Sequence, residues 1–245
     1  MQLDAHGNPE PIQLGDYRDV LAGVVCDALI CDPPYGKRTH DSEPRRGDRY
    51  DGVEKLDGLR PQYTAWSESD VYSFVASWSP RVAGWIVALT SHDLIPVWQA
   101  AYEDAGRYAF APVPCVIRGM SVRLGGDGPS SWAVYAMVSR PRSAAYSNWG
   151  TLDGAYIGPQ RTSEAGGGRG KPDWLMRALV RDYSRPGHLI VDPVCGWGST
   201  LIAALGLGRR ALGSEIDPDA VLEARRRLAR GTQTDLFSNA TTQEI

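Results

Sequence analysis

The sequence lacks the features of a membrane protein and of an exported protein. Its 245 residues contain no run close to the roughly 18 to 20 apolar residues that are needed to cross a bilayer. The first residues show no basic stretch followed by an apolar one, as an export signal would. A cytoplasmic protein without a membrane partner is therefore expected.

Cysteine is scarce as well. The chain has four cysteines, Cys26, Cys31, Cys115 and Cys195, all within or beside apolar segments and none in a CxxC pair. This pattern predicts buried reduced thiols, and it argues against a disulfide framework and against a zinc site. No metal is expected.

The chain also lacks a strong charge of either sign. A net charge of −3 gives no overall signal for nucleic acid. One polar segment, residues 37–66, is an exception because basic side chains interleave with acids there; this is either a solvated loop or a loop that contacts phosphates. Its place directly after a strand-ending turn favours phosphate contact, and the candidate DNA-binding residues are Lys37, Arg38, Arg45, Arg46 and Arg49.

Strands and helices are predicted to alternate through most of the chain, which indicates a doubly wound, mostly parallel α/β sheet. Residues 10–21 predict a short strand, a Gly-Asp turn and the start of a helix, and apolar runs predict further strands near residues 24–31, 84–90, 113–118, 132–138, 188–192 and 211–216. Helical spacing predicts helices near 70–80, 94–105, 172–183, 199–207 and 218–230. Between residues 140 and 170 the pattern fades, and we interpret this segment as a linker or an active-site lid within a single domain over residues 1–231.

The turn at residues 32–36, Asp-Pro-Pro-Tyr-Gly, follows the first of the long apolar strands. Two prolines cannot donate ladder hydrogen bonds, so the strand must end in a stiff turn. In an open α/β sheet, ligands bind at that edge. A carboxylate, a backbone carbonyl and an aromatic ring there suit a planar group that carries an amino nitrogen. His92, which also follows a strand, is interpreted as a loop or cap residue.

A second turn, residues 192–200, joins a strand to a helix and contains Gly196 and Gly198. Glycines let the backbone approach a ligand closely, and Glu215 follows at the end of the next strand, where an acid can bind ribose hydroxyls. A nicotinamide dinucleotide would need a small residue at position 201, where leucine stands. Asp192 suits a ligand with an ammonium group. These features favour S-adenosylmethionine as the cofactor.

With both turns in place, the chain resembles the S-adenosylmethionine-dependent DNA amino-methyltransferases, and the order of the two motifs resembles the circularly permuted β group. The resemblance implies a Rossmann-like fold, double-stranded DNA as the partner and a target base flipped out of the duplex. It assigns the catalytic motif to Asp32, Pro33, Pro34 and Tyr35. It assigns cofactor binding to Asp16, Lys171, Asp192, Pro193, Cys195, Gly196, Gly198, Ser199, Thr200 and Glu215.

The chain departs from the family pattern before Lys171, where residues 166–170 replace a His-Pro-Thr lead, and it has no long insertion for target recognition. An aspartate at the first motif position favours adenine N6 as the target. Cytosine N4, an RNA or a protein amide, and an inactive cofactor-binding module remain alternatives. Small size suggests a bacterial or phage enzyme that maintains methylation or belongs to restriction-modification, associated with the nucleoid.

Residues 232–245 are expected to form a flexible tail. Gln233, Leu236 and Phe237 within it resemble the short peptide by which bacterial proteins bind the replication sliding clamp. A tail packed back onto its own domain is the alternative.

Overall fold

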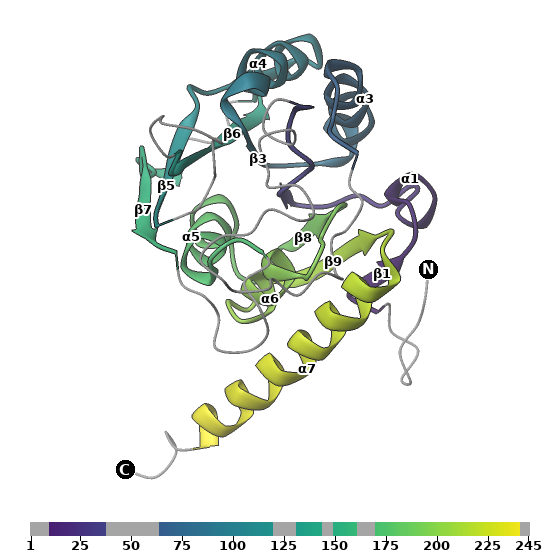
Figure 1. Cartoon of the computed structure of the whole chain (residues 1–245), viewed down its shortest axis with the longest axis vertical. Coiled ribbons are helices and arrows are strands. Elements are labelled where there is room, and N and C mark those ends of the chain that lie inside the picture. Colours follow the sequence, from purple (N-terminus) through teal and green to yellow (C-terminus); the bar gives the residue numbers. More distant parts are fainter. Residues whose placement is uncertain (1–9, 38–63, 120–130, 144–148, 161–169, 241–245) are drawn as a thin grey trace, which may run out of the picture.

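A computed structural model describes residues 10–37, 64–119, 131–143, 149–160 and 170–240, with side chains described as far as residue 230. These residues form a nine-stranded sheet with helices on both faces (Figure 1). Along the sheet the order is β1 (Ile12–Leu14), β9 (Arg210–Glu215), β8 (Leu189–Asp192), β2 (Ala28–Cys31), β3 (Ile86–Thr90), β6 (Ala133–Pro141), β5 (Val113–Arg118) and β7 (Tyr156–Pro159), and β4 (Arg107–Ala109) also pairs with β6.

The strands run mostly parallel, which confirms the predicted doubly wound α/β fold. β6 is antiparallel to its three neighbours β3, β4 and β5, whereas the other described pairs are parallel. The carboxyl ends of β1, β2, β8 and β9 therefore meet at one edge of the sheet. In this fold class that edge is where ligands bind.

Two layers of helix cover the sheet. Figure 1 shows α3 (Glu68–Trp78) and α4 (Ile95–Asp104) on one side, and α5 (Asp173–Tyr183) and α6 (Ser199–Leu205) on the other. The remaining helical elements are α1 (Tyr17–Val20), α7 (Pro218–Ala240) and two short 3-10 turns at Ser79–Arg81 and His92–Leu94. Among the described helices, none is both long enough and apolar enough to span a bilayer.

The pleat of the central strands divides the core between the two faces. In β2, Ile30 packs with α5 and α6, whereas Leu29 and Cys31 pack with α3 and α4. All three are fully buried, because a parallel strand with helices on both faces has no solvent side. Burying each such aliphatic side chain stabilises the fold by about 1.5–3 kcal/mol.

Two strands were not predicted. β4 has only three residues, and β7 contains a glycine and a proline, so neither gives a clear apolar alternation. β7 lies within residues 140–170, and its parallel pairing with β5 shows that this segment is partly a strand of the sheet. Gly158 in β7 faces the ring of Trp174 so closely that a Cβ at this position would overlap it. Packing against α5 therefore requires glycine at this position, and the glycine makes the strand hard to predict from the sequence.

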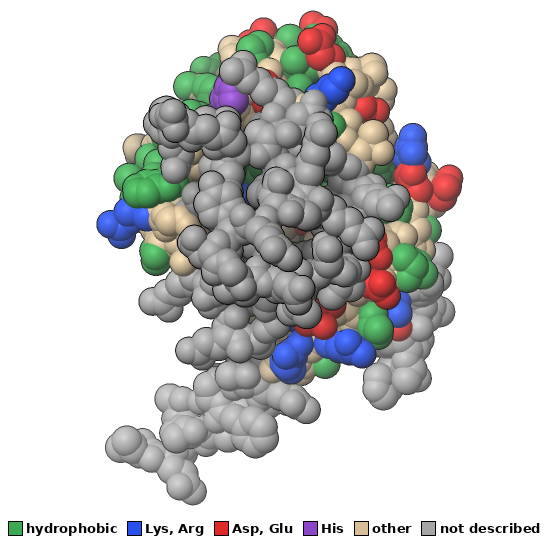
Figure 2. All heavy atoms as spheres, viewed as in Figure 1, with side chains coloured by type: hydrophobic (Ala, Val, Ile, Leu, Met, Phe, Trp, Pro, Cys, Tyr) green, Lys and Arg blue, Asp and Glu red, His purple; other side chains and the backbone are tan. Residues whose placement is uncertain are grey.

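α7 continues to Ala240, ten residues beyond the end that its apolar spacing predicts. The backbone of residues 232–240, which were expected to form a flexible tail, is helical here. Figure 1 shows this helix extending away from the sheet and its flanking helices. Basic side chains gather along its first part, as Figure 2 shows; Arg225, Arg226, Arg227 and Arg230 lie there.

Candidate active site

Four acidic residues lie at the carboxyl edge of the sheet, each at the end of a parallel strand. Asp32 follows β2, Asp192 ends β8, Glu215 ends β9, and Asp16 lies two residues beyond β1. The backbone N–H of Gly15 donates to the Glu215 carbonyl at 2.9 Å, which holds the Asp16 turn beside Glu215. The sheet topology thus brings together the two turns that the sequence singled out.

The carboxylate of Asp32 is held by two side chains. The Tyr35 hydroxyl donates to Oδ1 at 2.9 Å, and the Lys171 ammonium donates to Oδ2 at 2.5 Å. The ammonium also lies 4.8 Å from the centroid of the Tyr35 ring. Asp32, Tyr35 and Lys171 therefore form one cluster, although position 171 is 139 residues away in the chain.

The turn after β2 is closed by residues that the sequence did not predict. The backbone N–H of Trp66 donates to the Tyr35 carbonyl at 3.2 Å, and Gly36 forms a parallel bridge with Trp66. The Trp66 ring packs on Phe74 and Trp98. This contact holds Gly36 and Trp66, which flank the polar segment, next to Asp32. In the sequence, the one sign of this contact is a single tryptophan in a polar region.

Gly36 also lies against the strand end after β3. A Cβ at Gly36 would overlap the Asp93 carboxylate, which accepts a hydrogen bond from the Ser91 hydroxyl. His92 lies in the 3-10 turn at this point and is exposed, in agreement with its interpretation as a loop residue. The lack of a side chain at Gly36 is what lets the two turns pack together.

The turn between β8 and α6 is tied to β9 by three hydrogen bonds. Ser214 Oγ donates to the Pro193 carbonyl at 2.7 Å, and the N–H of Cys195 donates to the Ser214 carbonyl at 2.9 Å. The N–H of Gly196 donates to Glu215 Oε2 at 2.9 Å. Gly198 adopts φ = 76°, a left-handed conformation that favours glycine, immediately before α6. The predicted residues 192–200 thus form one rigid loop beside Glu215.

Glu215 is almost fully buried and its two oxygens accept backbone hydrogen bonds. Besides Gly196, the N–H groups of Ile216 and Asp217 donate to Oε1 at 2.8 and 2.9 Å. Burial raises the pKa of this carboxyl, and these hydrogen bonds oppose the rise. Because backbone donors fix its orientation, Glu215 presents a preorganised acceptor at the end of β9.

Asp192 is only 2% exposed. Burial raises its pKa to about 7; the side chain of Thr200 and the N–H of Val194 oppose the rise, and the negative charges of Asp32 and Glu215 add to it. A buried carboxyl beside two other carboxyls is a place where a cationic group is stabilised. This environment fits a ligand that carries an ammonium group.

Gly213 in β9 lies where the loop, β8 and α6 meet. A Cβ there would lie 2.8 Å from the Asp192 carbonyl, 2.9 Å from Leu201 Cδ1 and 3.0 Å from Cys195 Cβ. All three distances are at or below 3.0 Å, closer than a Cβ normally approaches a non-bonded atom. The three groups are well packed, so they have little room to move away.

Gly213→Ala is therefore expected to lower the free energy of unfolding by about 1–3 kcal/mol and to weaken cofactor binding, because the loop must shift to make room. Thermal unfolding and a binding titration measure both effects. Gly154→Ala is the matched control, since a Cβ at Gly154 meets nothing within 4 Å. Equal melting temperatures for the two variants would contradict the tight fit.

Two comparisons with known proteins bear on this site. The Escherichia coli (strain K12) protein YubD, which is named as a methylase, is 26% identical over 218 residues, covering 82% of each chain. A family model described as DNA methylase matches residues 158–226, the part that holds Lys171, the 192–200 loop and Glu215. These two matches support the DNA amino-methyltransferase family for this chain. This family methylates adenine N6 or cytosine N4 with S-adenosylmethionine as the methyl donor.

Solved structures confirm the fold of a methyltransferase. The M1.HpyAVI complex with S-adenosylmethionine superposes with a TM-score of 0.62 at 18% identity, covering 89% of this chain and 98% of that one. The PvuII DNA methyltransferase, which is specific for cytosine N4, gives a TM-score of 0.62 at 13% identity, covering 88% and 85%. A cytosine-N4 enzyme is thus among the structural neighbours.

The residues of this site fit S-adenosylmethionine. The Gly196 and Gly198 turn leaves room for close approach, the buried Asp192 suits the ammonium of the methionine part, and Glu215 suits the ribose hydroxyls. Asp16 already has partners within this chain. It caps α1 and is paired with Arg18, whose hydrogen bond lowers the pKa of this carboxyl. Within the described residues, no group of three or more potential metal ligands gathers.

Lys171 was expected at the cofactor. The structure places its ammonium on Asp32, in the turn after β2. Its neighbour Gly170 lies at the 192–200 loop, because a Cβ there would be 2.9 Å from Ser199 Oγ. The pair Gly170 and Lys171 thus lies between the two halves of the site.

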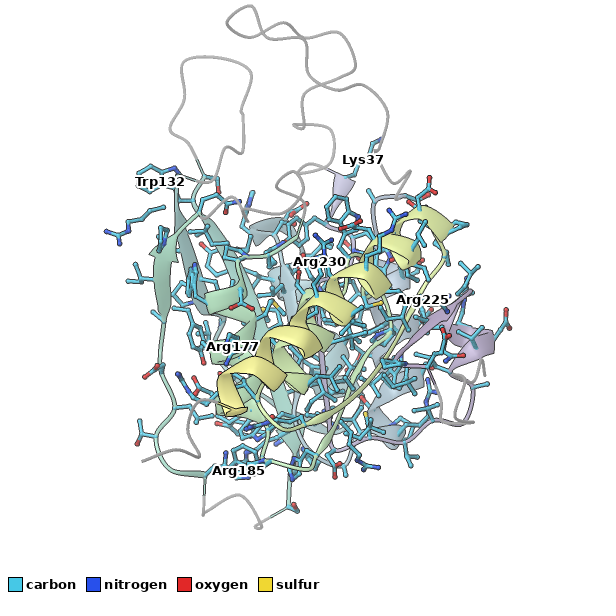
Figure 3. The ribbon with its side chains drawn as sticks, turned by 90° about the horizontal axis from the view of Figure 1, so that it is seen from below. Lys37, Trp132, Arg177, Arg185, Arg225 and Arg230 are labelled. Carbon is cyan, nitrogen blue, oxygen red and sulfur yellow. The ribbon has the colours of Figure 1, made fainter. Side chains whose placement is uncertain are left out.

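The other predicted residues are only partly described. Lys37 is exposed and lies at the same end of the molecule as Trp132, opposite Arg185 (Figure 3). Arg38, Arg45, Arg46 and Arg49 lie outside the described residues. Gln233, Leu236 and Phe237 lie in the part of α7 whose side chains are not described, so clamp binding stays a prediction.

Proposed function

We propose that this methyltransferase modifies the N6 amino group of adenine in double-stranded DNA. The observation that carries the proposal is the Asp32 carboxylate, held by Tyr35 and Lys171 at the sheet edge, with the cofactor loop of β8 at the same edge. This arrangement supplies an oriented acceptor for an amino group and an aromatic ring for a planar base.

Asp32 and the Pro33 carbonyl are the groups proposed to accept the two amino hydrogens. Accepting both hydrogens turns the nitrogen lone pair out of the plane of the base, where it is otherwise delocalised into the ring. Positive charge that develops on the nitrogen is stabilised by the nearby carboxylate, mainly in the transition state. When bound, S-adenosylmethionine supplies an electrophilic methyl group. The turn contributes orientation, because the prolines fix where the two acceptors lie.

Tyr35 is proposed to stack on the target base after it leaves the duplex. The Lys171 ammonium lies over the Tyr35 ring, so the base would stack on the opposite face. Lys37 and the basic residues that follow it are proposed to contact phosphates, since Gly36 and Trp66 hold both ends of that segment beside the site. The aspartate at the first motif position is what favours adenine.

Cytosine N4 is the second candidate, and the likeness to the PvuII enzyme favours it. Methylation of an RNA or a protein amide is a further alternative, because the turn requires only a planar amino group. Incubation with radiolabelled S-adenosylmethionine separates these classes when DNA, RNA and protein are offered in parallel. The proposal predicts label in double-stranded DNA; label only in RNA or protein, or none at all, would refute it.

Cofactor affinity should increase as the pH rises from about 6 to about 8. The Asp192 carboxyl has a pKa of about 7 in the free protein. An ammonium group binds the ionised form, so binding lowers this pKa and releases a proton; affinity is lost as the pH falls below 7. Calorimetry with S-adenosylhomocysteine, which carries the same ammonium, measures both affinity and proton release.

Asp192→Asn is the control for this pH dependence. It removes the titrating group while keeping the side-chain shape, so affinity should be weaker and independent of pH in this range. A wild-type affinity that stays constant between about pH 6 and pH 8 would contradict the assignment of Asp192 to the ammonium.

A further inference from the structure

The Asp32 carboxylate has both oxygens engaged by this chain's own residues. Oδ1 accepts from Tyr35 and Oδ2 accepts from Lys171. A carboxylate has about four acceptor positions, so two hydrogen bonds leave room for an amino hydrogen of a substrate. The two donors fix the plane of the carboxylate without blocking it.

The backbone before α5 fixes the position of Lys171. The residue precedes Pro172, which restricts it to extended conformations, and α5 is anchored by the buried Leu175 and Met176. On its other side, Gly170 has φ = 117° and packs at Ser199. The lysine side chain is 15% exposed and that of Asp32 is 30% exposed, so the pair is shielded from solvent more than a surface ion pair is.

The surroundings of Asp32 explain why the positive charge of Lys171 is needed there. Apart from Lys171, the described groups whose charges act on this part of the sheet edge are acidic or neutral: Asp192 interacts with Asp32, and the thiols of Cys31 and Cys115 are within range of its charge. Carboxylates that share a site disfavour each other's ionised forms. Lys171 is the described positive charge that offsets this repulsion at Asp32.

We propose that Lys171 is a positioning residue for methyl transfer, one that fixes the plane of the Asp32 carboxylate toward the target amine. The inference rests on the proposed function. It assigns Lys171 to the catalytic half of the site, in contrast to the cofactor role that the sequence pattern implies. The lysine acts through Asp32 and does not contact the reacting atoms.

Steady-state kinetics of Lys171→Met and Lys171→Arg test the inference. Lys171→Met should lower kcat by about 10- to 100-fold, because a misdirected carboxylate loses orientation, while the cofactor Kd stays nearly unchanged. Lys171→Arg keeps the positive charge and the hydrogen-bond donor, so its rate should fall less.

Arg177→Met is the matched control, because it also removes a cation, here within α5, yet lies away from Lys37 and the carboxyl edge (Figure 3). It should leave kcat unchanged. A Lys171→Met enzyme that keeps its kcat but loses cofactor affinity would overturn the inference and return Lys171 to the cofactor.

A measurement without turnover tests the ion pair itself. The chain has three lysines, Lys37, Lys55 and Lys171, so the side-chain ammonium signals in an NMR spectrum of ¹⁵N-lysine protein can be assigned by single substitutions. The signal of Lys171 should be slow to exchange with water and should shift or vanish in Asp32→Asn. An unchanged signal would refute the pairing. If the wild type methylated no DNA, the proposed function would fail while this test still decided the ion pair.

Discussion

Asp32→Ala is expected to reduce methyl transfer by about 10²–10³-fold or more while the cofactor Kd stays nearly unchanged. The carboxylate is the group proposed to accept an amino hydrogen and to stabilise the charge that develops on the nitrogen. Among the described residues it accepts hydrogen bonds from Tyr35 and Lys171, neither of which belongs to the 192–200 loop. Single-turnover rates on DNA and calorimetric titration with S-adenosylhomocysteine measure the two quantities separately.

Two further variants make this result interpretable. Asp32→Asn keeps the size of the side chain and one acceptor oxygen, so it should fold like the wild type and lose most of the rate. Asp104→Asn, an exposed aspartate at the end of α4, undergoes the same chemical change away from the site and should keep full activity. An Asp32→Ala enzyme that binds cofactor weakly but transfers methyl groups normally when saturated would reverse the assignment.

Glu215→Ala should raise the cofactor Kd by about 10- to 100-fold, with the rate largely restored at saturating cofactor. The substitution removes the carboxylate proposed to bind the ribose hydroxyls, and hydrogen bonds to a charged group contribute about 1.5–3 kcal/mol. It also leaves the N–H of Gly196 without the Glu215 oxygen to which it donates. Calorimetry and a rate measurement over a range of cofactor concentrations give both parameters.

Glu223→Ala is the control for Glu215. Glu223 lies on α7 and pairs at the surface with Arg226 and Arg230. Surface ion pairs contribute about 0–1 kcal/mol, so this variant should bind cofactor like the wild type. If Glu215→Ala raised the Kd no more than Glu223→Ala, the ribose site would have to lie elsewhere.

The sequence was sufficient to predict both turns of the site because each has a strong local cause. Two prolines end β2 at Asp32, and the glycines at 196 and 198 follow a buried strand. Alternation of strand and helix then predicts a parallel sheet, and a parallel sheet brings the carboxyl ends of β2, β8 and β9 to one edge. The meeting of Asp32, Asp192 and Glu215 is thus a consequence of local patterns.

The features that were missed depend on contacts between distant residues. The family pattern placed Lys171 with the cofactor, but the direction of its side chain depends on how α5 packs against β2. Trp66 closes the turn through a bridge to Gly36, which no periodic pattern in a polar segment predicts. β7 contains Gly158, where a side chain would overlap the ring of Trp174. Because glycine disfavours strand formation, the sequence of β7 does not predict the strand that this packing stabilises.

Mass spectrometry of nucleosides tests the central claim most directly. DNA free of methylated bases is incubated with the enzyme and S-adenosylmethionine carrying a ¹³C methyl group, then digested to nucleosides. The proposed role of the Asp32 turn predicts labelled N6-methyldeoxyadenosine from the wild type and none from Asp32→Asn. Label in N4-methyldeoxycytidine, or equal label from both proteins, would contradict it.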